Sequence, residues 1–143
     1  MLFLARNDYR QEYCNSMTVA QKTAIVIEDE PDAAEMFAEM MRVSGYRVLK
    51  TFSSTPAISL IEVEKPDIII LDVMMPDVSG LEVLRFIRRD PELSNIPVVV
   101  VSAKSMPSDV QVGMDAGASV YLTKPVGFRD LVEAVNKATG AAV

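Results

Sequence analysis

One stretch, residues 67–80, constrains the fold of this chain more than any other. Its sequence, DIIILDVMMPDVSG, is an unbroken apolar run that ends at the carboxylate of Asp72 and continues into a segment marked by Pro76 and Gly80. An apolar run this short, bounded by turn residues, is typical of a strand buried on both faces of a parallel sheet. Ligands bind outside the carboxyl ends of strands in open α/β sheets, so Asp72 is predicted to lie where a reactive group is expected.

Strands and helices are predicted to alternate along the rest of the chain. Short apolar runs predict further strands at residues 24–27, 96–101 and 118–122, and an alternating pattern predicts an edge strand at residues 47–51. Helical spacing and turn residues predict helices at residues 31–44, from Pro56 to just before Pro66, at 80–89, at 107–116 and from Phe128 onward. Strict alternation predicts an α/β fold with a doubly wound, five-stranded parallel sheet. The common order for five such strands is 2-1-3-4-5, as in flavodoxin-like folds.

The apolar residues of each helix define its predicted inner face. In the first helix they are Ala33, Phe37, Met40 and Met41, and in the last they are Phe128, Leu131, Val132 and Val135. The helix at 80–89 has Leu81, Leu84 and Ile87 on its inner face and Glu82, Arg85 and Arg88 on its outer face. The pattern indicates helices that pack on a sheet through one face each.

Length and composition favour a single soluble domain. The chain has 143 residues, half of them hydrophobic, which suits one domain with a substantial core, predicted at residues 23–140. Residues 1–22 are mixed polar without periodicity, so they are predicted to form a flexible extension or an upstream or tag remnant, with a docked helix as an open alternative. No apolar run approaches the roughly 18 residues of a membrane span, which argues against membrane insertion.

Charge and cysteine content narrow the partners and the compartment. The net charge is −6, which argues against direct nucleic-acid binding, because that affinity depends on neutralising phosphates. Cys14 is the single cysteine and the chain contains no histidine, so neither an internal disulfide nor a histidine-activated thiol is available. A cytoplasmic protein with protein partners is therefore expected.

Polar residues follow four of the predicted strands and are expected to meet at one edge of the sheet. They are Glu28, Asp29, Asp72, Ser102 and Lys124. Three carboxylates in one crevice repel one another unless a cation is present, and Mg²⁺ prefers such oxygen ligands. A carboxylate beside Mg²⁺ can attack a phosphoryl group, while an ammonium and a hydroxyl group hold its oxygens. This edge is therefore predicted to be a site of aspartyl phosphorylation.

Four motifs carry a resemblance to a known family. They are VIEDEP at 26–31, LDVMMPDVSG at 71–80, VSA at 101–103, and AGA followed by YLTKP within 116–125. In this order and spacing, the chain from about residue 23 to residue 137 resembles the CheY-like receiver domains of two-component response regulators. The resemblance implies that Asp72 accepts a phosphoryl group from a phosphohistidine of a sensor histidine kinase or phosphotransfer protein. It also implies a downstream protein target that responds to the phosphorylated form.

The resemblance assigns the metal and phosphate ligands residue by residue. Asp29 and Asp72 would ligate Mg²⁺ directly, together with the backbone carbonyl of Met74, while Glu28 would act through water. Glu28 stands where the family commonly has Asp, which lengthens the reach to the metal and keeps the charge. Such a protein would be a phosphoacceptor with self-phosphorylation and autodephosphorylation activity rather than a conventional enzyme.

The same resemblance assigns the switch. Ser102 and Lys124 would hold phosphoryl oxygens, and Ser102 would move toward them on phosphorylation. Tyr121 matches the aromatic residue whose rotamer follows that movement, and Lys124-Pro125 matches a cis peptide bond of the family. Lys104, like Met74, occupies a position where family members tune the lifetime of the phosphoryl group, so that lifetime is left open.

Other classes of protein remain to be weighed against this interpretation. A metal-dependent aspartyl phosphatase would carry a second acid at Met74, whose side chain cannot transfer a proton. A dinucleotide-binding module would carry a G-x-G-x-x-G sequence after the first strand, which this chain lacks. A receiver-like interaction module that is never phosphorylated is the remaining alternative. The chain is expected to be either a stand-alone receiver or a piece of a longer regulator.

Overall fold

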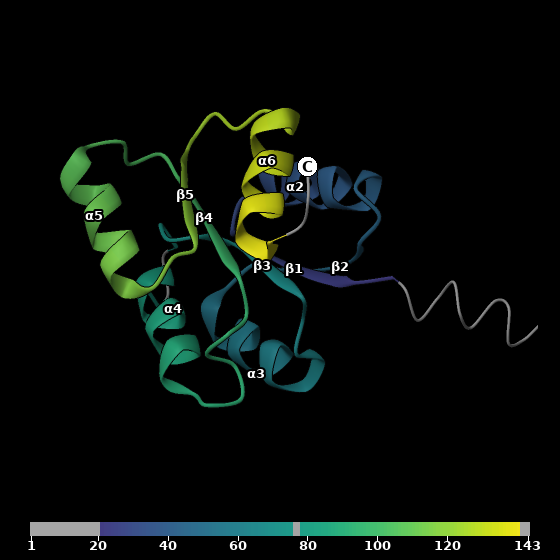
Figure 1. The fold of residues 1–143 in the computed structure, drawn as a ribbon, viewed down its shortest axis with the longest axis horizontal. Coiled ribbons are helices and arrows are strands. Elements are labelled where there is room, and N and C mark those ends of the chain that lie inside the picture. Colours follow the sequence, from purple (N-terminus) through teal and green to yellow (C-terminus); the bar gives the residue numbers. More distant parts are fainter. Residues whose placement is uncertain (1–20, 76–77, 141–143) are drawn as a thin grey trace, which may run out of the picture.

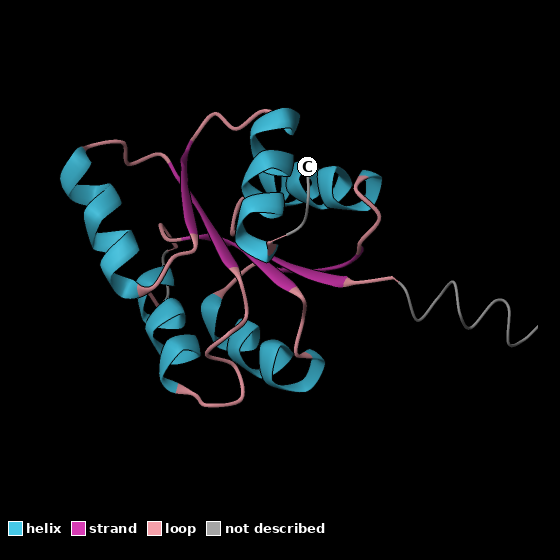
Figure 2. Cartoon of the chain, viewed as in Figure 1, coloured by secondary structure: helices cyan, strands magenta, loops and turns pink. Residues whose placement is uncertain are grey.

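Five parallel strands form the centre of the molecule (Figures 1 and 2). The computed structural model describes residues 21–75 and 78–140, so most of the predicted extension at 1–22 lies outside the described residues. The strands are β1 (Thr23–Ile27), β2 (Arg47–Thr51), β3 (Ile68–Asp72), β4 (Val98–Ser102) and β5 (Val120–Thr123). Their order is β2-β1-β3-β4-β5 and every pairing is parallel, which confirms the predicted fold.

Helices cover both faces of this sheet (Figure 1). One face carries α2 (Pro31–Val43) and α6 (Phe128–Thr139), and the other carries α3 (Ser54–Glu64), α4 (Gly80–Arg89) and α5 (Pro107–Ala116). Within the described ranges, none of these helices is long and apolar enough to cross a membrane. The sheet is thus a layer between two sets of helices. Both faces of its central strands are covered, so side chains can reach a ligand at the ends of these strands.

The central strands are apolar throughout because both of their faces are covered. Successive residues of β3 pack alternately, so Ile69 and Leu71 contact the core cluster on one face while Ile68 and Ile70 contact the cluster on the other. Burial of such a side chain contributes about 1.5–3 kcal/mol relative to exposure. This continuous burial fixes the position of Asp72 at the end of β3.

The ends of α2 and α3 follow from local chemistry. The side chain of Glu30 accepts hydrogen bonds from the backbone N–H groups of Asp32 (3.2 Å) and Ala33 (2.7 Å) and caps α2. Gly45, with φ of +98°, follows the last turn of α2, where glycine adopts this left-handed conformation without strain. The helix predicted to begin at Pro56 begins instead at Ser54, because proline is tolerated anywhere in a first turn, where no helical N–H partner is needed.

Two strand boundaries also differ from the prediction. β4 begins at Val98 rather than at residue 96, and β5 begins at Val120 rather than at residue 118. The N–H of Ala118 donates to the carbonyl of Gly113 (3.1 Å), so this residue closes the end of α5 instead of pairing with β4. Apolar runs therefore mark the strands but not their first residues.

The predicted inner faces were partly wrong. In α2 the buried residues include Ala34 and Ala38, while Ala33 and Met40 are half-buried. Phe128 was predicted to face the core but is 46% exposed, and it is the first residue of α6. Arg88 was predicted to face solvent but is half-buried and donates to backbone carbonyls of neighbouring loops.

Candidate functional site

The ends of β1 and β3 bring three carboxylates together. The two strands are neighbours, with Ile27 opposite Leu71, so the residues that follow leave the sheet side by side. One oxygen each from Glu28, Asp29 and Asp72 lies within 4.8 Å of the others. The predicted acidic cluster therefore exists, and it occupies the point where the strand order of the sheet reverses.

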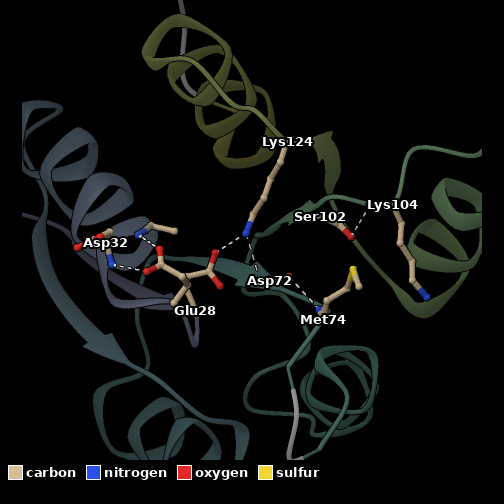
Figure 3. A network of polar contacts seen from close by, with 9 residues as sticks. Glu28, Asp32, Asp72, Met74, Ser102, Lys104 and Lys124 are labelled. Carbon is tan, nitrogen blue, oxygen red and sulfur yellow. Dashed lines mark hydrogen bonds and ion pairs between the residues drawn. The ribbon is translucent and has the colours of Figure 1, made fainter.

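Lys124 closes this cluster from the end of β5 (Figure 3). Its ammonium group lies 2.5 Å from Oε1 of Glu28 and 3.3 Å from Oδ2 of Asp72. The peptide bond between Lys124 and Pro125 is cis, as the family resemblance implied. Among the residues that the structure describes, Lys124 is thus the only cation in contact with Asp72, and it also contacts Glu28.

Glu28 is the most constrained of the three acids. It is 1% exposed, and its Oε2 atom has no hydrogen-bond partner among the described residues. Burial, and then the neighbouring Asp72, raise the pKa of Glu28 from 4.5 to about 7, although Lys124 opposes the shift. Burial also tends to lower the pKa of Lys124, but the two carboxylates outweigh it and raise that pKa above its ordinary value.

These groups fit a hard divalent cation. The cluster offers oxygen atoms only, and the unpartnered Oε2 of Glu28 is a buried acceptor that a cation or its bound water would satisfy. A positive ion would also relieve the repulsion between Glu28 and Asp72 that raises the pKa of Glu28. The donor set is therefore the kind that Mg²⁺ prefers.

The loop after β3 holds Asp72 in place. The backbone N–H of Met74 donates to Oδ1 of Asp72 (2.9 Å), while the side chain of Met74 is 48% exposed. Gly80 lies against the end of β3, since a Cβ atom there would be 2.6 Å from the carbonyl oxygen of Asp72 and 2.5 Å from the Cα atom of Val73. A glycine is therefore required for α4 to begin this close to the strand.

A second set of contacts links Ser102 to Tyr121 through the loop after β4. Ser102 is fully buried, and its hydroxyl oxygen accepts a hydrogen bond from the backbone N–H of Lys104 (3.1 Å; Figure 3). The phenol of Tyr121 donates to the backbone carbonyl of Lys104 (2.9 Å). One residue of the loop therefore contacts both predicted switch residues through its main chain.

The structure supports some predicted positions more directly than others. Four predicted residues come together, namely Glu28, Asp29, Asp72 and Lys124. Ser102 lies on the neighbouring strand β4, one residue after Val101, which pairs with Asp72. The proposed metal contact through the carbonyl of Met74 stays a prediction. The linking role of Lys104 was missed, because a main-chain contact leaves no mark on the identity of a side chain.

Fold and site together define a class of protein: a doubly wound α/β domain with an acidic crevice and a lysine at its switch point. A family model described as the response regulator receiver domain matches residues 24–136. The polar-differentiation response regulator DivK of Brucella ovis is 32% identical over 121 residues, which cover 85% of this chain and 98% of DivK. The chain therefore belongs to the response regulator receiver domain family.

Solved structures agree with this assignment. The receiver domain of response regulator 1452 from Francisella has 27% identity and a TM-score of 0.77, and the match covers 84% of this chain and 98% of that one. The chemotaxis protein CheY4 of Vibrio cholerae has a TM-score of 0.78 and covers 83% of this chain and 99% of its own, at 23% identity. The latter likeness concerns the fold alone.

Proposed function

We propose that this receiver domain, at residues 23–140, accepts a phosphoryl group on Asp72 from a sensor histidine kinase or a phosphotransfer protein. The observation that supports this most is the buried Asp72 carboxylate with two further acids on one side and the Lys124 ammonium on the other. The chain contains no histidine, so the phosphohistidine that donates the group would lie outside these 143 residues. The proposed setting is the cytoplasm, where the family operates.

The transfer needs a nucleophile and positively charged or hydrogen-bonding groups that stabilise the phosphoryl oxygens, but no general base. An oxygen of the Asp72 carboxylate attacks the phosphorus, the phosphorus–nitrogen bond of the phosphohistidine breaks, and the imidazole nitrogen leaves with the bonding electron pair and takes up a proton from solvent. Lys124 moves from its carboxylate partners to a phosphoryl oxygen, and the Ser102 hydroxyl donates to another. Both residues can make these contacts from their present places at the ends of β5 and β4.

Mg²⁺ is proposed as the cofactor, held by Asp29 and Asp72 with the carbonyl of Met74, and by Glu28 through water. When bound, this ion supplies positive charge that offsets the charge of the phosphoryl oxygens. Glu28 has a further effect on Lys124, because it holds the ammonium group at 2.5 Å, closer than Asp72 does. A cation near Glu28 would weaken that hold and release Lys124 toward the phosphoryl group.

The proposed output is a change of the partner-binding face. A phosphoryl group adds about −1.5 to −2 charge at Asp72. Ser102 would leave the N–H of Lys104 to bind it, and the carbonyl of the same residue holds Tyr121. A movement of Ser102 is thereby passed to Tyr121 and to a downstream protein that contacts the region of β5.

Two alternatives are separable from this proposal. A phosphatase would need a proton donor two residues after Asp72, and Met74 supplies only an exposed thioether side chain. A receiver-like interaction module that is never phosphorylated would have no need of Lys124 so close to Asp72. The first would turn over phosphate esters, and the second would take up no phosphoryl group.

Acetyl phosphate with Mg²⁺, read by intact mass, separates the three functions. The proposed function predicts a single phosphoryl adduct that requires Mg²⁺ and is absent in Asp72→Asn. Asp32→Asn, which changes an exposed acid in the first turn of α2, is the matched control and should still form the adduct. Wild-type protein that binds Mg²⁺ but stays unmodified would contradict the proposal, and steady hydrolysis of p-nitrophenyl phosphate would favour the phosphatase.

A further inference from the structure

Helix α2 carries two apolar stripes, and only one of them lies wholly in the core. Phe37 and Met41 belong to the stripe that packs on the sheet. Met36, Met40 and Val43 form the second stripe, at the spacing of residues that share one helix face. The side chains of Met36 and Val43 are 42% and 66% exposed. A second apolar stripe indicates a helix that contacts something besides its own sheet.

The first residue of α6 turns this second stripe into a groove. Helices α2 and α6 cover the same face of the sheet (Figure 1), and Phe128 lines the groove together with the three residues of the stripe and Glu39. The groove has a volume of about 470 Å³, within the roughly 300–1,000 Å³ of ligand pockets. Its lining is apolar except for Glu39, so it suits a few apolar side chains with a positive charge beside them.

The first six residues of the chain offer this combination. Residues 1–4, with the sequence MLFL, are all apolar, and Arg6 follows them after one alanine. On the groove, Glu39 has an exposed carboxylate, and its partner Arg42 divides its contacts between Glu39 and Glu35. Arg6 would therefore bring a second cation to Glu39. An exposed ion pair contributes little affinity, so the apolar residues would contribute most of it.

The segment that contains these residues joins the sheet close to the groove. The carbonyl of Lys22, just before β1, accepts a hydrogen bond from the N–H of Arg47 (2.8 Å). The N–H of Tyr46 donates to the carbonyl of Met41 (3.0 Å) in the last turn of α2. Lys22 therefore lies near the end of α2 at which Val43 lines the groove.

The length of chain before β1 is sufficient to reach the whole groove. Roughly 17 residues separate the apolar residues 1–4 from Lys22, and a chain of that length can span about 20–25 Å without full extension. The 13 residues of α2 make a helix about 20 Å long. Residues 1–4 can therefore reach any part of the groove from their own chain.

We propose that residues 1–4 of this chain dock in the groove between α2 and Phe128, with Arg6 beside Glu39. A tethered segment suits the groove better than a second copy of the chain, because stable complexes bury about 1,200–2,000 Å² and five side chains line this groove. A tether supplies an effective concentration on the order of millimolar, so weak contacts suffice. The docked segment covers this face of α2, and a partner protein that used the face would first have to displace it. The inference does not depend on phosphorylation of Asp72 and is tested separately from it.

Methionine methyl resonances of the full-length chain test whether the segment occupies the groove. Phe3→Ser removes the only aromatic ring among residues 1–4. The methyl signals of Met36 and Met40 should shift in this variant, because their resonances depend on the nearby ring. Met106 and Met114 are exposed on α5, on the opposite face of the sheet, and their signals should stay in place.

Two results of this comparison would overturn the proposal. Unchanged signals at Met36 and Met40 would show that the segment does not lie in the groove. A difference between wild type and Phe3→Ser that disappears on dilution would show that a second copy supplies the segment.

Trypsin cleavage after Arg6 tests the groove from its other side. A docked segment resists the protease, because cleavage has to wait until the segment leaves the groove. Val43→Ser should therefore make this cleavage about twofold faster or more. Val63→Ser is the matched control, since Val63 is 80% exposed on α3 at the opposite face, and it should keep the wild-type rate. Equal rates in wild type and Val43→Ser would contradict docking at this groove.

Discussion

Glu28 has the least usual surroundings of the three acids in the candidate site. It is buried, it holds Lys124, and one of its oxygens has no protein partner among the described residues. Burial of this ionised carboxylate is unfavourable, and Lys124 offsets only part of that cost. The acidic cluster therefore has a buried acceptor that the proposed cation would satisfy.

The raised pKa of Glu28 predicts a pH dependence of stability in chelator-treated protein. The pKa of Glu28 is about 7 in the folded chain against an ordinary value of 4.5, so between these two pH values the folded chain binds more protons than the unfolded chain. The contribution of Glu28 to the free energy of unfolding is thus fully present below pH 4.5 and is lost as the pH rises through about 7. Glu28→Gln should abolish this loss and should stabilise the chain at pH 8 by roughly 1–3 kcal/mol.

Urea denaturation at pH 5, 6, 7 and 8 is the measurement, and Glu62→Gln on the exposed face of α3 is the control. The control should keep the wild-type fall in stability with pH. A Glu28→Gln protein whose stability falls as steeply as that of the wild type would show that another group is responsible.

At the scale of elements, α4 contributes more than an amphipathic helix. Its inner face packs on the sheet, its first residue lies against the end of β3, and Arg88 binds the loops before β4 and β5. The helix therefore links the end of β3, where Asp72 lies, to the end of α5. Arg85 and Arg88 lie three residues apart on α4 but have different surroundings. A comparison of the two therefore measures what Arg88 contributes to the free energy of unfolding.

Arg88→Ala should destabilise the chain by about 2–3 kcal/mol, because a charged donor is removed from several backbone carbonyls that lie in half-buried positions. Arg85→Ala removes only an exposed ion pair with Glu82 and should cost at most about 1 kcal/mol. Chemical denaturation of both variants checks the difference. Equal costs would mean that the carbonyls find other donors when Arg88 is absent.

For the whole molecule, the fold could be predicted from the sequence because buried parallel strands leave a strong signal. Four apolar runs and one alternating strand, each followed by a helical pattern, allow few topologies, and the parallel arrangement places all strand ends at one edge. That edge predicted the meeting of Asp72, Asp29 and Lys124 before any contact was known. The direction of each strand was enough to predict which residues lie at this edge.

What could not be predicted depends on side-chain geometry. The charge of Arg88 suggested solvent, since periodicity does not reveal nearby carbonyls that accept from it. The apolar spacing of Phe128 suggested the core, because the pattern does not show where the sheet ends. The closer pairing of Lys124 with Glu28 than with Asp72 also has no sequence signal.

Mg²⁺ should stabilise the molecule as a whole through its site. A ligand that binds only the folded chain raises stability by about 2.7 kcal/mol at a concentration one hundred times its dissociation constant. Thermal unfolding with increasing Mg²⁺ should therefore show a rising midpoint for the wild type and a much smaller rise for Asp29→Asn. The control is Asp32→Asn, whose unfolding midpoint should rise with Mg²⁺ as much as that of the wild type. Identical curves for wild type and Asp29→Asn would show that the ion binds elsewhere.

The central claim is that the phosphoryl group resides on Asp72, and its chemical location can be measured directly. Borohydride reduces an acyl phosphate to an alcohol, so an aspartyl phosphate becomes homoserine at the modified position. After treatment with acetyl phosphate and Mg²⁺, peptide sequencing by mass spectrometry should find homoserine at position 72 and at no other acid. Homoserine at position 29, hydroxynorvaline (the reduction product of a glutamyl phosphate) at position 28, or no reduced residue in protein that carries the adduct would contradict the account.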